Sequence, residues 1–130
     1  MSAIEQFTGS APRILAGARI LAGIMFACHG AQKVFGVFGG VPPTAPALII
    51  WTSGPIELIG GILIALGLFT RSAAFLSSGL MAVAYFMAHA PKSFFPIVNG
   101  GDSAVQFCFV FLYLVFAGAG AWSLDAKRGA

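Results

Sequence analysis

The sequence predicts an all-α fold, an integral membrane bundle of four helices running up and down with both termini on the same, cytoplasmic side. Two observations indicate this class. Of the 130 residues, 58% are hydrophobic and only 8% are charged, whereas a soluble domain carries about 25% charged residues. The apolar residues also form four segments of about 20, the length that a helix needs to cross a bilayer. We therefore expect one multi-pass membrane domain, residues 1–130.

The predicted spans cover about 12–33, 47–69, 72–90 and 103–122. Pro12 suits the first turn of a helix, where its missing N–H costs nothing. A Gly/Pro-rich loop follows the first span, Thr70-Arg71 is a tight turn, and PKSFFPIVNGGD forms a second long loop. Both long loops are thus expected on the side opposite the termini.

The basic residues predict the orientation of the spans. The side of the termini carries Arg13, Arg71, Lys127 and Arg128, and the side of the long loops carries Lys33 and Lys92. Since cytoplasmic loops are enriched in Lys and Arg, the termini are expected in the cytoplasm. The seven basic residues form no patch interleaved with aromatic residues, so nucleic-acid binding is not expected. The first apolar stretch follows no positive n-region, so it is expected to be retained as a span.

Small residues recur at four-residue spacing, which lets helix backbones approach closely in lipid. The pairs are Gly23 and Ala27, Gly61 and Ala65, Ser78 and Ala82, and Ala117 and Ala121. On the first span, Arg19, Phe26 and Lys33 fall on one line because successive residues turn by about 100°. This face is expected to point into the bundle.

The ionisable residues within the spans are the first place to look for function. Lys33 is either an interfacial anchor whose side chain snorkels to water or a site residue. His29, less than a quarter-turn away, is either satisfied by a neighbouring carbonyl or part of a site. From its depth, Arg19 is expected to reach Asp125, forming a structural ion pair.

Glu57 lies in the run SGPIELIGG of the second span. Pro55 is expected to kink the helix or restart it. If the helix restarts, Gly54 is its N-cap and Glu57 lies at N3. There its carboxylate either complements the positive helix end or holds a proton or a partner in a cavity. The depth of His29 makes it the expected partner of Glu57.

The ends of the helices on the long-loop side predict a polar layer above Glu57. This layer is either the polar end of a bundle or a ligand site, and its candidate ligand-binding residues are His29, Lys33, Glu57, His89, Asn99 and Gln106. Cys28 and Cys108 are interpreted as inert buried thiols, with a redox-active pair as the alternative. No His/Cys spacing indicates a metal site.

Several motifs resemble the DoxX family in the expected order along nearly the whole chain. They are the run from Arg19 through His29-Gly30 to Gln32-Lys33, the segment ELIGGILIALGLFTRSAA (57–74), Asn99-Gly100-Gly101-Asp102, and GAGAWSLD (118–125). The resemblance implies a small four-helix inner-membrane protein of bacteria or archaea. It also implies a link to thiosulfate:quinone oxidoreductase or to membrane complexes that handle thiols and oxidative stress.

The first functional hypothesis is therefore a quinone-interacting membrane subunit of an oxidoreductase complex. His29 and Glu57 would supply polar, proton-exchanging groups in a Phe-rich bundle. No intrinsic cofactor is expected, so electrons must come from a partner subunit. The alternatives are a membrane anchor or assembly factor for a soluble redox enzyme, and a small-solute or proton carrier, which would need a homo-oligomer.

Overall fold

The computed structural model describes residues 1–129, and within that range every regular element is a helix. The elements are α1 (Ala3–Phe35), α2 (Ala47–Leu66), α3 (Thr70–Ala84) with its π-helical continuation η1 (Tyr85–His89), α4 (Pro96–Asn99), α5 (Asp102–Ala117) and α6 (Leu124–Lys127). Three helical stretches are long and apolar enough to cross a membrane, namely α1, α2 and Thr70–His89. The predicted all-α membrane class is confirmed at this level.

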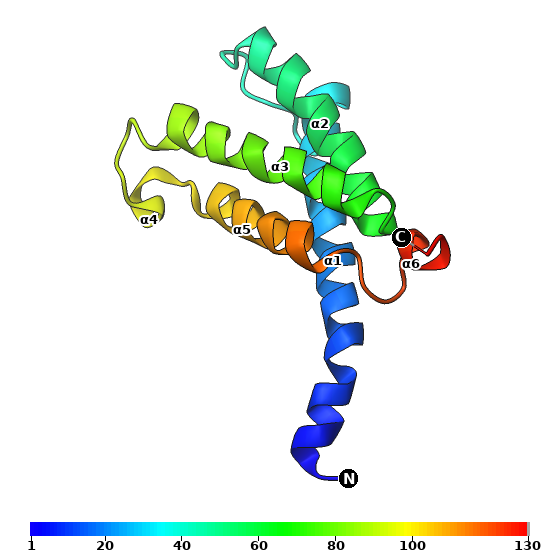
Figure 1. Cartoon of the computed structure of the whole chain (residues 1–130). Helices are drawn as coiled ribbons and strands as arrows, with labels where there is room; N and C mark the ends of the chain where they lie inside the picture. Colours follow the sequence, from blue (N-terminus) through cyan, green and yellow to red (C-terminus); the bar gives the residue numbers. More distant parts are fainter. Residues whose placement is uncertain (130) are drawn as a thin grey trace.

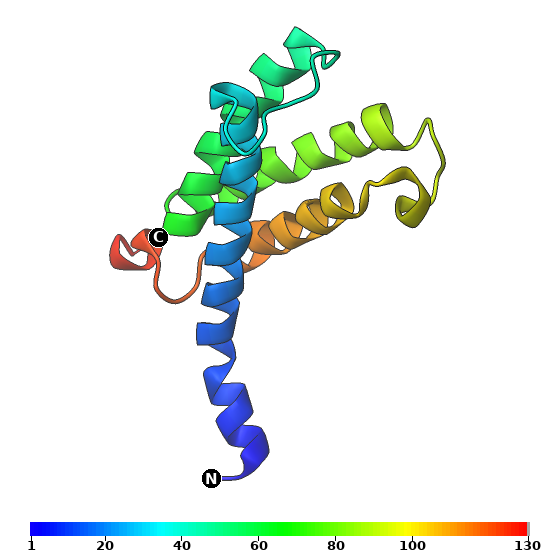
Figure 2. The same cartoon turned by 180° about the vertical axis from the view of Figure 1, so that it is seen from behind.

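The helices form two pairs that diverge from one another (Figures 1 and 2). α1 packs along α2, and α3 packs along α5. The pairs meet at a core that includes Phe26 of α1, Ile64 of α2, and Phe107 and Phe111 of α5. The Phe26 ring lies 4.8 Å from the Phe111 ring in an edge-to-face arrangement, measured between centroids. The two pairs therefore touch near this core and separate toward the ends that carry the long loops.

Two predicted helix boundaries are wrong for identifiable reasons. α1 begins at Ala3, not near Pro12, because Ser2 and Glu5 form a capping box; Pro12 removes one intrahelical hydrogen bond without ending the helix. The fourth predicted span, 103–122, ends at Ala117, because Gly118 adopts a left-handed φ of 76°. At 16 residues α5 is about 24 Å long.

Glycines bring the backbones of α1 and α2 into direct contact. A Cβ built on Gly23 would lie 2.5 Å from the Ala65 nitrogen, and one on Gly30 would lie 2.2 Å from the Leu58 nitrogen. Gly61 makes the reciprocal contact, since its Cβ would lie 2.4 Å from the Ala27 nitrogen. The predicted role of the Gly/Ala pairs of these two helices is confirmed, and the contact fixes their register.

Arg19 ties together the end of the molecule opposite the long loops. Its side chain is 1% exposed. It donates to the Ile64 carbonyl at 3.1 Å, to the Ala121 and Trp122 carbonyls at 2.9 and 2.8 Å, and to the Ala119 carbonyl. A guanidinium group with five donors can thus cap the end of α2 and hold the chain that follows α5.

The expected ion pair between Arg19 and Asp125 does not form among residues 1–129. The Asp125 carboxylate instead accepts hydrogen bonds of 2.9 Å from the backbone N–H groups of Phe69 and Thr70. Its partner cation is Arg128, at 3.7 Å. Asp125 therefore caps the N-terminus of α3, where the helix dipole favours negative charge. Arg19 instead meets carbonyls of the chain after α5, a segment in which Gly118, Gly120 and Trp122 have positive φ.

The glycine contact predicts unequal effects of two alanine substitutions on the same helix. Gly30→Ala should destabilise the protein by about 2 kcal/mol or more, because its Cβ would overlap the backbone of α2. Gly17→Ala is the matched control, because nothing lies within 4 Å of its Cβ position; it should be neutral or stabilising by up to about 1 kcal/mol. Thermal unfolding in detergent measures both, and equal melting temperatures would contradict the proposed contact.

The cap on α3 predicts a pH-dependent contribution to stability. Burial by itself raises the pKa of Asp125, but the hydrogen bonds from Thr70 and Phe69 and the charge of Arg128 outweigh it and hold this pKa below its ordinary value. The carboxylate therefore stabilises the fold above about pH 4, and this contribution is lost as the pH falls through the lowered pKa of the folded state. Asp125→Asn should lower the free energy of unfolding by about 1–2 kcal/mol at pH 7. It should also remove the part of the stability loss at acid pH that comes from protonation of this carboxylate. Asp102→Asn, at an exposed carboxylate, is the control expected to keep the wild-type profile.

Candidate functional site

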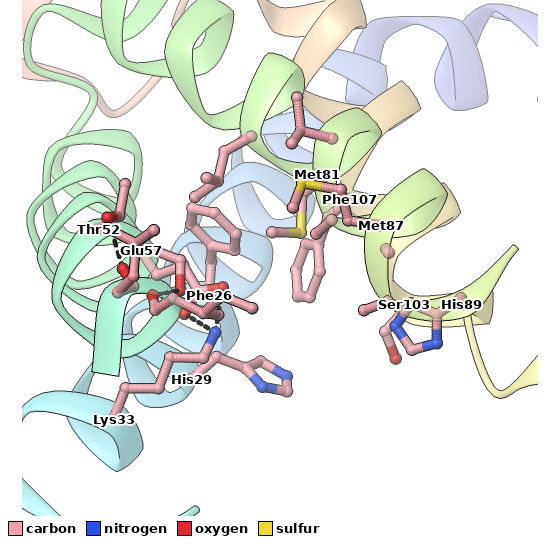
Figure 3. A pocket seen from close by; sticks show the side chains of 18 residues that line it. Phe26, His29, Lys33, Thr52, Glu57, Met81, Met87, His89, Ser103 and Phe107 are labelled. Atoms are coloured by element: carbon pink, nitrogen blue, oxygen red, sulfur yellow. Dashed lines mark hydrogen bonds and ion pairs between the residues drawn. The ribbon is translucent and has the colours of Figure 1, made fainter. Parts of the chain in front are cut away.

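A cavity of about 560 Å³ lies between the two helix pairs, with walls from α1, α2, α3, η1 and α5 (Figure 3). Most of its lining is apolar and includes Phe26, Met81, Met87 and Phe107. The polar side chains of the lining are His29, Lys33, Thr52, Ser53, Glu57, His89 and Ser103. Ligand sites commonly combine an apolar lining and a few polar groups in this way, with volumes of about 300–1,000 Å³.

Lys33 and Glu57 form an ion pair on the α1–α2 wall of the cavity (Figure 3). The Lys33 Nζ lies 2.7 Å from Oε1 and 2.5 Å from Oε2 of Glu57. Glu57 is 3% exposed, and the side chain of Lys33 is 22% exposed. The carboxylate is thus covered by protein, and the ammonium is the more accessible member of the pair.

The prediction that His29 is the partner of Glu57 is wrong, because depth alone does not determine which side chains meet. The glycine contacts place Lys33 beside Gly54, where its Cβ lies 3.1 Å from the Cβ position of that glycine. Its side chain then reaches Glu57, almost one helical turn further along α2. His29 is exposed, and its ring packs edge-on against Phe107 at 5.9 Å between centroids.

The predicted restart of the second helix at Pro55 is also wrong. α2 runs without a break from Ala47 to Leu66 with Pro55 inside it. Glu57 therefore does not lie at a helix N-terminus, and its compensation comes from Lys33. Proline is tolerated within membrane helices because neighbouring groups can satisfy the freed backbone atoms.

His89 lines the cavity from η1, where the α3 helix widens in its last turn. Its Nδ1 lies 3.1 Å from the Asn99 carbonyl oxygen, and because a carbonyl only accepts, Nδ1 carries the hydrogen. In the neutral ring, Nε2 is then a free acceptor. Its ring also stacks on Tyr85, so the side chain is held on the wall opposite Lys33.

Two predicted ligand residues lie outside the cavity lining. Asn99 is 4% exposed and donates to the Tyr85 hydroxyl and the Ser93 carbonyl, while its Oδ1 accepts from the Gly101 N–H at 2.7 Å. It closes the loop before α5. Gln106 is exposed on α5 and is absent from the lining.

The structure adds lining residues that the sequence did not indicate. Thr52 and Ser53 donate their hydroxyls to the Leu48 and Ile49 carbonyls at 2.6 and 2.7 Å, so they offer only lone pairs to the cavity. Met87 and Ser103 complete the opposite wall. The only feature of the sequence that could have indicated Thr52 and Ser53 as lining residues is their proximity to the Gly-Pro pair in α2.

The two cysteines are free and do not pair with each other. Cys108 lies on α5, where its carbonyl accepts from the Ser78 hydroxyl at 2.8 Å. Within residues 1–129, no three His, Cys, Asp or Glu side chains gather as a metal-ligand set.

Comparison with known proteins shows a match to a family and a bacterial relative. Residues 14–90 match the DoxX family model. The chain is 44% identical over 123 residues to a Haemophilus influenzae protein described as uncharacterized, covering 89% of this chain and 91% of that protein. No solved structure matches the chain.

The ion pair predicts that its two partners depend on each other. Lys33→Met or Glu57→Met alone should destabilise the protein by about 3 kcal/mol, because a charge stays in the protein without its partner. The double variant K33M/E57M should recover most of that loss, because replacing a buried pair by apolar side chains is often neutral. Unfolding in detergent tests this double-mutant cycle, and additive losses would contradict the coupling.

Proposed function

The chain belongs to the DoxX family of membrane proteins, and from this premise and the cavity we propose that it is a quinone-interacting membrane subunit of an oxidoreductase complex. The observation that carries the proposal is the apolar cavity with a small number of polar groups on facing walls. We further propose that the protein is a multi-pass protein of the inner membrane. In this proposal α5 completes a four-helix arrangement and both termini are cytoplasmic.

The shape and chemistry of the cavity fit a quinone. A volume of about 560 Å³ between helix pairs accommodates a substituted ring with part of an isoprenoid chain. Phe26 and Phe107 offer aromatic faces and edges to a planar ring. When bound, a quinone supplies reversible two-electron, two-proton chemistry, for which the electrons would be exchanged with a partner subunit.

The polar residues of the cavity have distinct tasks in this proposal. Lys33 donates a hydrogen bond to a ring carbonyl, and Glu57 holds the ammonium in place. The free Nε2 of His89 can accept a hydrogen bond on the opposite wall, and His29 offers a second imidazole to the cavity. The Lys33 donor would bind a carbonyl of the quinone, and the His89 acceptor on the facing wall would bind a hydroxyl of the reduced quinol.

The alternative, a membrane anchor or assembly factor for a soluble redox enzyme, is favoured by the N-terminal part of α1. The helix has 33 residues, about 50 Å, and its first half extends past the end of α2 (Figures 1 and 2). Ile4, Phe7 and Ile14 on this part are more than 70% exposed. Such an arm could recruit a partner without any ligand in the cavity.

Photo-crosslinking tests the quinone proposal. A photoactivatable benzoquinone analogue should label α1 and η1 of the purified protein in lipid nanodiscs, and an unlabelled short-chain quinone should compete. Met87→Trp, which fills the cavity, and His29→Ala should each reduce labelling several-fold. Gln106→Ala, outside the lining, is the matched control and should label like the wild type.

Labelling that is unchanged in Met87→Trp and His29→Ala would contradict the assigned site. A different result would replace the quinone function by the anchor function: the wild type is not labelled, and a partner enzyme co-purifies with it in mild detergent. Loss of that co-purification on removal of residues 1–13 would identify the α1 arm as the recruiting element.

A further inference from the structure

We propose that the Lys33–Glu57 pair makes the cavity selective for lipids with a neutral, hydrogen-bond-accepting head, and that it excludes lipids with a carboxylate head. This inference rests on the proposed function, because it takes the cavity to be a ligand site. It adds the chemical basis on which the site would choose among the many apolar molecules of a bilayer.

The ammonium of Lys33 has one donor to spare. An ammonium carries three N–H groups, and in residues 1–129 its partners are the two carboxylate oxygens of Glu57. Lys33 is the more exposed member of the pair, with 22% of its side chain accessible against 4% for Glu57, and both residues line the cavity. A ligand therefore meets an N–H donor that is strengthened by its charge.

The same wall carries no net charge, because the carboxylate accompanies the ammonium. A lipid carboxylate entering the cavity would lose its hydration without gaining an uncompensated cation. Thr52 and Ser53 cannot help it, since their hydroxyl hydrogens are used by Leu48 and Ile49. A neutral carbonyl loses far less hydration and still receives the Lys33 hydrogen bond.

The cations at the end of the molecule opposite the long loops do not change the net charge of the cavity wall. Arg19 is held by backbone carbonyls at the end of α2, and Arg71 donates to the Val115 and Phe116 carbonyls at the end of α5. Neither residue lines the cavity. The ionisable lining residues besides the pair are His29 and His89, and His89 offers an acceptor in its neutral form.

Competition against the photoactivatable benzoquinone analogue tests the selectivity. In the wild type, a short-chain benzoquinone should compete about tenfold or more better than a saturated fatty acid or an alkane of matched chain length. In K33M/E57M the benzoquinone should lose this advantage over the alkane, because the benzoquinone and the probe both lose the Lys33 hydrogen bond, while the alkane still displaces the probe. Glu57→Gln, which leaves an unpaired ammonium, should raise the affinity for the fatty acid about tenfold.

The outcomes separate this inference from the proposed function. Equal competition by benzoquinone and fatty acid in the wild type, or an unchanged benzoquinone preference in K33M/E57M, would overturn the selectivity while leaving a quinone site in place. Absence of competable labelling would overturn the proposed function itself. K33M/E57M keeps the test valid if either single variant fails to fold, because alkane competition reports that the cavity is intact.

Discussion

The close contact between the backbones of α1 and α2 is the constraint on which the rest of the structure depends. In a membrane, lipid tails are as apolar as the side chains, so helices associate through packing and polar contacts. Gly23, Gly30 and Gly61 let the two backbones touch, and that contact allows only one register. The register brings Lys33 beside Gly54, from where it reaches Glu57. The formation of the Lys33–Glu57 pair in an apolar environment thus depends on glycines, which have no side chain.

At the other end of the same helices, buried polar groups hold the two helix pairs together. Arg19 satisfies carbonyls of α2 and of the chain after α5, and Asp125 satisfies the first N–H groups of α3. Leaving such groups unpaired would cost several kcal/mol each in hydrocarbon. Because these contacts are concentrated at one end, the pairs are free to diverge at the other (Figure 1). The cavity is lined by residues of both pairs.

The sequence by itself determined the class of the protein, because class depends on local properties. Hydropathy and length identify membrane helices, and Gly and Pro mark the loops between them. The inward face of α1 followed from helical period, and it is confirmed by the burial of Arg19, Gly23, Phe26 and Gly30. The motifs of this helix and of residues 57–74 also identified the family, which the match over residues 14–90 confirms.

Only the tertiary structure decided which polar groups meet, because that depends on the register and rotation of helices far apart in sequence. The estimated depths predicted His29 as the partner of Glu57, but the register set by the glycine contact pairs Glu57 with Lys33. Asn99 belonged to the predicted polar layer, but its side-chain amide bonds Tyr85, Ser93 and Gly101 and closes the turn before α5. Gln106 had the expected depth but faces away from the cavity, since residues at one level of a bundle point in different directions around their helices.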